Sequence, residues 1–223
     1  MAKKQKCKKK LRLWGQSLLI HNVFQFDQKI RKKFKVNIIA GVDEAGRGCI
    51  CGPLVAAAVV FDKNVYIPSL QESKSLSLYK RIYFFKQILF FAKSVSYHIV
   101  SVREINKLGL SKANLLAMKY AIDKLSIKPE LVIIDGFHNP YIDNVKQFSL
   151  AKADEKSAVV AAASIVAKVI RDKIMEFYHF VIPEYDLVNN KGYPTKKHIY
   201  MVSKIGLCEL HRYYAYKFIK NDH

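Results

Sequence analysis

Residues 36–61 read VNIIAGVDEAGRGCICGPLVAAAVVF, and this stretch predicts the beginning of a β-sheet. Residues 36–43 are rich in β-branched side chains and end at a glycine-rich turn, a pattern typical of a strand. Residues 54–61 form a short, uncharged apolar run after Gly52-Pro53, as expected of a buried strand. We therefore expect the two strands to pair as a hairpin, with Asp43 and Glu44 where the first strand ends.

The rest of the chain alternates between strand and helix patterns. Apolar spacing, Ser and Thr N-caps and proline stops predict these elements: a helix over 78–93 capped by Ser77, strands over 95–102, 131–135 and 145–150, and helices over 111–125, 155–180 and 195–206. Ser111 and Thr195 are the expected caps of two of these helices. Strands first, then strands alternating with helices, predict an α/β fold in which helices cover a mixed sheet.

The charge is strongly positive and unevenly distributed. The 223 residues contain 38 Lys and Arg against 18 Asp and Glu, a formal charge of +20. Residues 1–35 hold 12 of the basic residues and one acid, Asp27. We interpret 1–35 as a basic arm, partly disordered over 1–10 and with a short helix over 24–35, and 36–223 as one domain. Such a charge indicates a polyanionic partner, above all nucleic acid.

Other classes of protein are disfavoured. The longest apolar runs, residues 51–61 and 158–167, are shorter than the ~18 residues that a membrane span needs, and the N-terminus lacks a secretory pattern. The cysteines Cys7, Cys49, Cys51 and Cys208 form no CxxC pair, and His211 near Cys208 lacks the other ligands of a zinc finger. We therefore expect a monomeric cytoplasmic protein without a disulfide framework or structural zinc.

Four carboxylates stand where burial is expected. Asp43 and Glu44 follow one apolar strand, Asp135 follows another, and Asp154 precedes the most apolar helix. Buried carboxylates are costly unless they are paired or bind metal, and oxygen ligands without His or Cys favour Mg²⁺ or Mn²⁺. Two such ions can activate a water and stabilise a leaving oxygen in phosphodiester hydrolysis.

Each assignment has an ordinary structural alternative. A capping or turn role explains Asp154 or Asp135 singly, and Glu155 and Asp172 compete with Asp154 for the fourth ligand position. We expect Asp172 to pair with Lys168 one helical turn away. Asp43 and Glu44 converge only if the strand ends between them, because neighbouring strand residues face opposite sides. The glycine-rich stretch fits neither a P-loop nor a dinucleotide motif.

Ordered motifs extend this picture along most of the chain. They are DEAGRG at 43–48, GPLVAAAV at 52–59, Ser73-Lys74-x-Leu76-Ser77, Ile134-Asp-Gly136, Asp154 ahead of AAASIVAKV at 161–169, Arg171-Asp172, and Lys191-Gly-Tyr-x-Thr-x-x-His198. In this order they resemble the ribonuclease HII family over roughly residues 36–212. The resemblance implies a ribonuclease H-like mixed β-sheet flanked by α-helices.

The resemblance also implies an activity and a set of residues. The expected reaction is metal-dependent hydrolysis of RNA in RNA/DNA hybrids and nicking 5′ of a ribonucleotide embedded in duplex DNA, leaving a 3′-hydroxyl and a 5′-phosphate, as in ribonucleotide excision repair. By motif, the catalytic metal ligands are Asp43, Glu44, Asp135 and Asp154. The implied substrate-binding residues are Gly46, Arg47 and Gly48 at the 2′-hydroxyl, Lys74 at a phosphate and Tyr193 at a sugar.

Several positions depart from the family pattern, and two other functions compete with this one. The departures are Glu72, Asn106, Gly109, Asn114, Ala153 and the run Tyr213-Tyr214-Ala215 after His211-Arg212. Ribonuclease HIII would share the fold and the carboxylates, but 35 residues before the domain are too few for its usual N-terminal domain. A non-catalytic nucleic-acid-binding module would explain the charge without explaining carboxylates at two strand ends.

Overall fold

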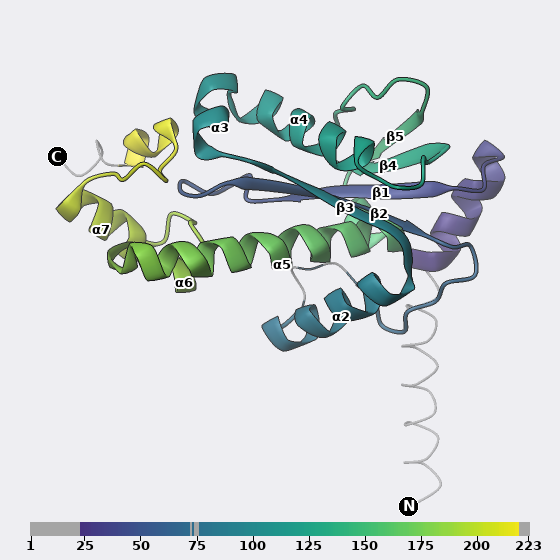
Figure 1. Cartoon of the computed structure of the whole chain (residues 1–223), viewed down its shortest axis with the longest axis horizontal. Helices are drawn as coiled ribbons and strands as arrows, with labels where there is room; N and C mark the ends of the chain where they lie inside the picture. The colour runs from purple at the N-terminus through teal and green to yellow at the C-terminus, as the bar shows by residue number, and fades with distance from the viewer. Residues whose placement is uncertain (1–22, 72, 74–75, 219–223) are drawn as a thin grey trace, which may run out of the picture.

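The computed structural model describes residues 23–71, 73 and 76–218 (Figure 1). The expected disordered arm over 1–10 and the candidate ligand Lys74 lie outside these residues. A helix over residues 23–34 matches the helix expected over 24–35, and its residues Val23 and Ile30 are buried in the main core. The boundary between arm and domain at residue 36 stays a prediction, with this helix packed against the domain that follows.

A mixed sheet of five strands forms the centre of the molecule, in the order β3-β2-β1-β4-β5. The expected hairpin is confirmed, because β1 (Ile39–Ala45) pairs antiparallel with β2 (Leu54–Phe61). β3 (Ala92–Val100) continues the antiparallel side, whereas β4 (Leu131–Asp135) and β5 (Lys146–Leu150) are parallel to β1. β1, which carries Asp43 and Glu44, and β4, which ends at Asp135, are therefore direct neighbours in the sheet.

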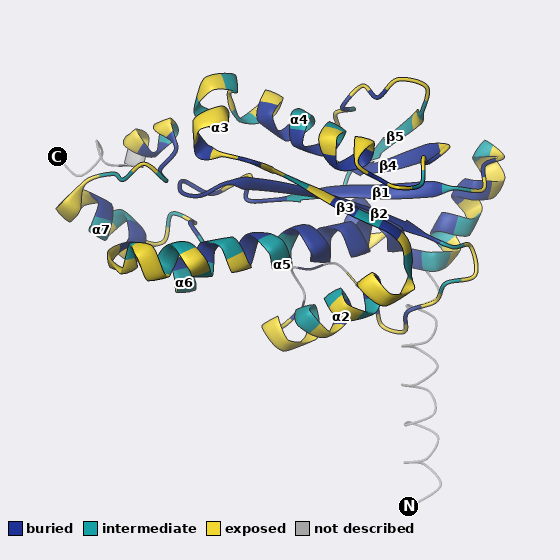
Figure 2. Ribbon diagram, viewed as in Figure 1, coloured by how far each residue is buried: buried dark blue, intermediate teal, exposed yellow. Residues whose placement is uncertain are grey.

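Helices cover both faces of this sheet. α5 (Ala158–Val181) crosses one face with α2 (Leu78–Phe91) beside it, and α4 (Leu110–Asp123) covers the other (Figure 1). The strands β1, β2 and β4 and the first half of α5 are the most completely buried parts (Figure 2). No described helix is long and apolar enough to span a membrane.

The alanine-rich start of α5 explains how closely this helix approaches the sheet. A side chain at Gly41 of β1 would place its Cβ 2.3 Å from the carbonyl carbon of Val159. Small residues in this stretch therefore let helix and strand backbones meet, and the close approach fixes the beginning of α5 beside β1. Ser157 caps the helix by accepting a hydrogen bond from the Val160 N–H.

Alternate residues of the sheet belong to two different cores. On β1, Ile39 and Ala45 contribute to the core under α5, whereas Ala40 and Val42 contribute to the core under α4. This alternation is the period of two that a strand covered on both faces requires. It also determines which helix each functional side chain of β1 faces.

Several elements differ from the sequence predictions. A separate helix, α3 (Val102–Leu108), follows β3, because Ser101 and Glu104 form a reciprocal capping box that ends the strand. The next helix starts at Leu110 after Gly109, so the proposed cap at Ser111 was wrong. The predicted start of the long helix at 155 was also early, since Ser157 caps it and Asp154 and Glu155 lie in the 3₁₀ turn η2 (Ala153–Glu155).

The C-terminal part consists of short elements packed against the end of α5. They are η3 (Pro183–Tyr185), α6 (Leu187–Asn190), α7 (Lys196–Ile205) and η4 (Tyr213–Phe218). The predicted helix after Thr195 is confirmed, with Thr195 as its cap and Gly206 at its end. These elements form a third, smaller core that includes Cys51 and Met175.

Candidate active site

Three of the four predicted carboxylates meet at one edge of the sheet. Asp43 on β1, Asp135 at the end of β4 and Asp154 in η2 each place a carboxylate oxygen within 4.8 Å of the other two. Asp43 and Asp135 follow the paired residues Val42 and Ile134 of two adjacent parallel strands. Both continue the set of strand residues that faces α5, so their side chains lie on the same side of the sheet.

Asp154 is brought to this edge by the turn that precedes α5. The backbone N–H of Ala153 donates a hydrogen bond of 2.6 Å to Asp135 Oδ1. Lys152 adopts a left-handed conformation just before η2, which turns the chain back toward the sheet. Asp135 therefore fixes the loop that carries Asp154, in addition to offering an oxygen of its own.

The environment of Asp43 is both buried and negative. Asp43 is 5% exposed, and its Oδ1 accepts a hydrogen bond of 2.7 Å from the Glu44 N–H. Burial raises the pKa of Asp43 well above its usual value, and the charges of Glu44 and Asp135 raise it further. Such repulsion among buried carboxylates is what a bound cation relieves.

The donor set fits a hard divalent cation. All three groups offer carboxylate oxygen, the ligand that Mg²⁺ and Mn²⁺ prefer. Two oxygens bound to one Mg²⁺ at ~2.1 Å lie at most ~4.2 Å apart. The observed limit of 4.8 Å is therefore within a small side-chain adjustment of binding geometry.

Glu44 does not join this group of three. β1 continues through Ala45, with Glu44 opposite Ala56 and Asp43 opposite Ala57, so the expected end of the strand between Asp43 and Glu44 was wrong. Glu44 instead continues the alternate positions of β1 that face α4. Its role as a metal ligand stays a prediction.

The two competing acids have other partners. Glu155 forms an ion pair of 3.1 Å with Lys152 at the surface. Asp172 is buried on α5, where it accepts hydrogen bonds from Lys168 at 2.7 Å and Arg81 at 3.3 Å. The predicted pair of Asp172 with Lys168 is confirmed, and Asp154 is the acid of this region that approaches Asp43 and Asp135.

A buried arginine, Arg171, packs against the glycine-rich loop on its interior side. Gly46 has φ +102°, and a Cβ there would lie 2.2 Å from Arg171 Nε and 2.8 Å from the Pro53 carbonyl oxygen. Arg171 is fully buried and donates hydrogen bonds to the carbonyl oxygens of Pro53, Lys191 and Cys51 at 3.0, 2.8 and 3.2 Å. One guanidinium thus ties the loop to the segment that carries Tyr193.

A second buried arginine repeats this arrangement. Arg212 is fully buried and donates to the carbonyl oxygens of Gly52 and Pro53 at 2.9 and 3.1 Å. Sequence patterns alone assigned Arg171 and Arg212 no role. The signal available for Arg171 was its place among apolar residues on the buried face of a long helix, where a cation needs polar partners.

Tyr193 stands beside the same loop. Its side chain is 40% exposed, and a Cβ at Gly48 would lie 3.7 Å from its ring. The Lys168 ammonium lies 5.6 Å from the ring centroid, within cation–π range. Gly48 and Tyr193 therefore lie close together next to the exposed Arg47, and a role of these residues in substrate binding stays a prediction.

Lys74 lies outside the described residues, but its neighbour Ser73 packs against α5 close to the acidic group. Ser73 is buried, and its hydroxyl lies 2.8 Å from the hydroxyl of Ser164 on α5. Ser164 in turn hydrogen-bonds Asp43. Ser73 is therefore anchored one side chain away from the acidic group.

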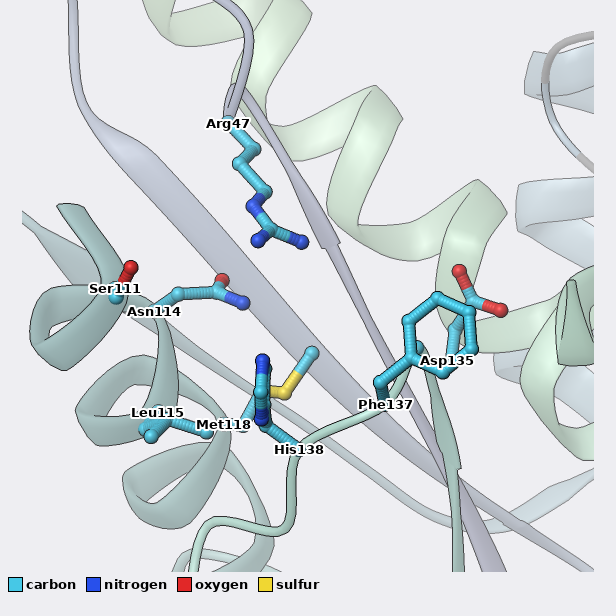
Figure 3. Close-up of a pocket in the computed structure, with 9 residues that line it drawn as sticks. Arg47, Ser111, Asn114, Leu115, Met118, Asp135, Phe137 and His138 are labelled. Atoms are coloured by element: carbon cyan, nitrogen blue, oxygen red, sulfur yellow. The ribbon is translucent and has the colours of Figure 1, made fainter. Parts of the chain in front are cut away.

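A pocket connects the loop with the acidic edge (Figure 3). It is lined by Arg47, Ser111, Asn114, Leu115, Met118, Asp135, Gly136, Phe137 and His138. The Arg47 guanidinium and the Asn114 amide point into it from the loop and from α4. Asn114 Oδ1 is buried and has no hydrogen-bond partner among the described residues. The sequence marked Asn114 only as a departure from a family pattern, because a polar residue on a helix does not reveal what it faces.

Solved structures define the class of fold. The crystal structure of ribonuclease H2 from Pyrococcus horikoshii matches with a TM-score of 0.70 and 26% identity, covering 82% of this chain and 97% of that one. A ribonuclease HIII solved in complex with Mn²⁺ matches with a TM-score of 0.63 and 19% identity over 82% of this chain and 64% of its own, a likeness of fold alone. The five-stranded mixed sheet with flanking helices is a ribonuclease H-like fold, as predicted.

Sequence relatives define the family. The model of the family described as ribonuclease HII matches residues 40–220. Ribonuclease HII of Mycoplasma mycoides subsp. mycoides is 38% identical over 195 residues, 87% of this chain and 94% of that protein. Ribonuclease HII of Caldanaerobacter subterraneus subsp. tengcongensis is 45% identical over 177 residues, 79% of this chain and 73% of that protein. The chain belongs to the ribonuclease HII family and is a ribonuclease H endonuclease, which cleaves RNA in RNA/DNA hybrids.

Proposed function

We propose that this ribonuclease H uses Mg²⁺ or Mn²⁺ and also nicks duplex DNA on the 5′ side of a single embedded ribonucleotide. The products would be a 3′-hydroxyl and a 5′-phosphate. The observation that carries the proposal is the convergence of Asp43, Asp135 and Asp154 beside a loop that can approach a sugar closely. A monomeric state and a cytoplasmic location are further parts of the proposal and rest on composition alone.

The acidic group would hold the cations. Asp43, Asp135 and Asp154 meet at one edge of the sheet, and Glu44 stands next along β1, where its carboxylate can serve a second ion. Bound divalent cations would supply an activated water and charge stabilisation of the leaving 3′-oxygen, so that no covalent enzyme intermediate forms. The hydrogen bond from Ala153 to Asp135 and that from Glu44 to Asp43 orient the carboxylates for this purpose.

The glycine-rich loop would recognise the ribose. The 2′-hydroxyl is the group that distinguishes a ribonucleotide from a deoxyribonucleotide at one position. Gly48 is exposed and has no Cβ, so its backbone can approach a sugar, and the adjacent Arg47 side chain points into the pocket beside Asp135. Tyr193 beside Gly48 would pack against the neighbouring sugar, and Lys74 would contact a phosphate.

A cleavage assay tests this proposal. The substrate is an end-labelled DNA duplex with one internal ribonucleotide, compared with the all-DNA duplex and an RNA/DNA hybrid, with Mg²⁺, with Mn²⁺ and with EDTA. We expect one nick 5′ of the ribonucleotide with either metal, none with EDTA and none in all-DNA duplex. Uncut ribonucleotide-containing duplex alongside a cleaved hybrid would contradict the finer part of the proposal.

Two neighbouring acids give a matched pair of variants. Asp154→Asn should lower the cleavage rate by at least ~100-fold, because changes in mere outer-shell partners of metal ligands already cost roughly 10- to 100-fold. Glu155→Gln should keep the wild-type rate, since Glu155 pairs with Lys152 at the surface. Thermal melting of both variants checks that they fold. Equal rates for the two variants would remove Asp154 from the site.

A further inference from the structure

A second cluster of ligand-type side chains lies in the C-terminal core, apart from the carboxylates. Cys51, His198 and His211 are buried, and each places one ligand atom within 4.8 Å of the other two. Cys51 forms an isolated antiparallel bridge with His211, and His198 lies in the first turn of α7. The sequence predicted no zinc site, because these residues are scattered from position 51 to position 211. Only the fold brings them together.

The hydrogen bonds of the two histidines show which nitrogen atoms face the centre of the cluster. His198 Nδ1 lies 2.9 Å from the Tyr193 carbonyl oxygen, which can only accept, so the proton of His198 is on Nδ1. Its Nε2 lone pair faces His211 Nε2 at 3.1 Å. His211 Nδ1 points the other way, where it accepts a hydrogen bond of 3.1 Å from the backbone N–H of Cys208 and lies 3.2 Å from Cys208 Sγ, so the proton of neutral His211 is on Nε2.

This geometry fits a tetrahedral ion with thiolate and imidazole ligands. Two nitrogens bound to one Zn²⁺ at ~2.0–2.1 Å lie about 3.3 Å apart. The two Nε2 atoms, at 3.1 Å, therefore need to separate by only a few tenths of an ångström. The bond from His198 Nδ1 to a backbone carbonyl is also the usual outer-shell arrangement of a metal-binding histidine. We propose that Cys51 Sγ, His198 Nε2 and His211 Nε2 bind a zinc-type ion, with the fourth position open to water.

Proton and charge balance involve Cys208. On binding, Cys51 loses its thiol proton, and the proton of neutral His211 moves from Nε2 to Nδ1, so Nδ1 gives up the hydrogen bond that it accepts from the Cys208 N–H and donates one to Cys208 Sγ instead. Cys208 then accepts this hydrogen bond best as a thiolate, which releases a second proton. Two thiolates offset the two charges of the ion, and this matters because Arg171 and Arg212 are buried at the carbonyl groups of Cys51 and Gly52.

The cluster lies next to a surface pocket. A pocket lined by Cys208, His211 and Arg212, together with Arg103, Lys107 and Tyr213, opens beside the cluster. Solvent therefore comes close to His211 at one side of the cluster. The oxygen donors Asp43, Asp135 and Asp154 belong to a separate group, so the two sites differ in the class of metal that they favour.

The ion would act as a clamp. It would join the segment just after Gly48 to α7 and to the chain after α7, and through His198 it would hold the carbonyl of Tyr193. The loop and the tyrosine that touch substrate in the proposed function would thus be fixed relative to one another. The inference itself requires neither the carboxylate site nor cleavage activity.

Cobalt titration of the full-length, metal-free protein tests the site. Co²⁺ serves as the probe, because a Co²⁺–thiolate bond gives an intense charge-transfer absorption that carboxylate ligands do not produce. We expect this absorption to saturate at one equivalent and to disappear on addition of one equivalent of Zn²⁺. We also expect Zn²⁺ to raise the melting temperature. Absence of the thiolate absorption in the wild-type protein would overturn the proposal.

Matched variants locate the ligands. Cys51→Ser should abolish the absorption, whereas Cys49→Ser should keep it, because Cys49 is also buried but its Sγ faces the Lys191 carbonyl oxygen at 3.7 Å. Cys208→Ser should keep the absorption and weaken binding by about 10-fold or more, the range found for outer-shell partners. Absorption that persists in Cys51→Ser, or that vanishes in Cys49→Ser with its fold intact, would contradict the assignment.

Discussion

Gly46 and Gly48 are two residues apart in the loop that follows Asp43, yet the backbone imposes different demands on them. Gly46 is buried, has a left-handed φ of +102° and packs against Arg171, whereas Gly48 is exposed and, among the described residues, has Tyr193 as its neighbour. A shared glycine motif therefore hides two roles. One glycine is required by the fold, and the other leaves a surface open.

Alanine substitution separates these roles. Gly46→Ala should lower the free energy of unfolding by about 2–6 kcal/mol, because left-handed strain and overpacking each contribute roughly 1–3 kcal/mol. Gly48→Ala should change it by less than ~1 kcal/mol, since the added Cβ meets an ordinary van der Waals neighbour at 3.7 Å. Its cleavage of ribonucleotide-containing duplex should nevertheless fall. Urea denaturation and the nicking assay measure the two effects, and equal losses of stability would refute the distinction.

Residue patterns predicted which acids would meet more reliably than they predicted how those acids are arranged. Asp43, Asp135 and Asp154 were recognisable because each follows or precedes an apolar run, where a charge is unexpected. The face on which Glu44 lies depends on whether β1 bends, and pairing with β2 decided that. Local patterns did not single out Asn114, Arg171 or Arg212. Asn114 matters because it lines the pocket, and the two arginines matter because they bind carbonyl groups far away in the sequence.

At the level of elements, the start of α5 connects the active site to the helix over residues 23–34. Asp27 is 2% exposed and accepts hydrogen bonds from the Ser157 hydroxyl at 2.6 Å and the Val159 N–H at 3.1 Å. These groups form the N-terminus of α5, directly after the turn that holds Asp154. Burial raises the pKa of Asp27 to about 7, although its hydrogen bonds act in the opposite direction.

This raised pKa makes stability depend on pH. The folded state keeps the Asp27 proton up to about pH 7, whereas the unfolded chain loses it near the ordinary value of 3.8. The contribution of this proton is therefore complete below about pH 4 and is lost as the pH rises through 7, by up to roughly 4 kcal/mol at 1.36 kcal/mol per pKa unit. The variant Asp27→Asn lacks this pH dependence, because an asparagine side chain does not ionise in this range.

The expected result is a difference between two proteins. The stability of the wild type relative to Asp27→Asn should decrease by a few kcal/mol between pH 4 and pH 8, as measured by urea denaturation at each pH. Taking the difference cancels the titration of the other carboxylates. A difference that stays constant over this range would show that Asp27 is ionised in the folded protein throughout.

Element boundaries show where local signals were sufficient. Ser77 and Thr195 were identified as caps because an N-cap hydrogen bond joins residues only three positions apart, so the local sequence reveals it. The helix α3 was missed although Ser101 and Glu104 form a capping box, because the apolar pattern of β3 continues toward it. Packing of α5 against Gly41 and the pairing order of the sheet involve residues far apart in the chain, which no local pattern reports.

At the level of the whole molecule, charge and chemistry are divided between parts of the chain. The +20 charge favours binding to polyanions, while three carboxylates converge at one sheet edge. Residues 1–10 contribute six lysines. We expect this arm to increase affinity for duplex by binding the phosphate backbone, without a part in the chemical step.

Salt dependence tests the arm. Replacing the six lysines of residues 1–10 by glutamine should reduce the slope of log affinity against log salt by about 0.9 for each phosphate that these residues no longer neutralise. Replacement by arginine should keep the slope, and the rate at saturating substrate should remain unchanged in both variants. An unchanged slope in the glutamine variant would exclude the arm from binding.

The sequence by itself determined the order of the elements, the ribonuclease H-like class and the identity of the principal acids. These properties follow from hydrophobic periodicity, short-range caps and an ordered set of motifs, all of which act between near neighbours in the chain. Tertiary structure alone decided that Asp43 and Glu44 face opposite helices, that Arg171 and Arg212 hold the loop from within, and that Cys51 meets His198 and His211. The physical reason is that these relations arise when separate segments pack together and exclude water, and the pattern of any one segment does not contain its partner.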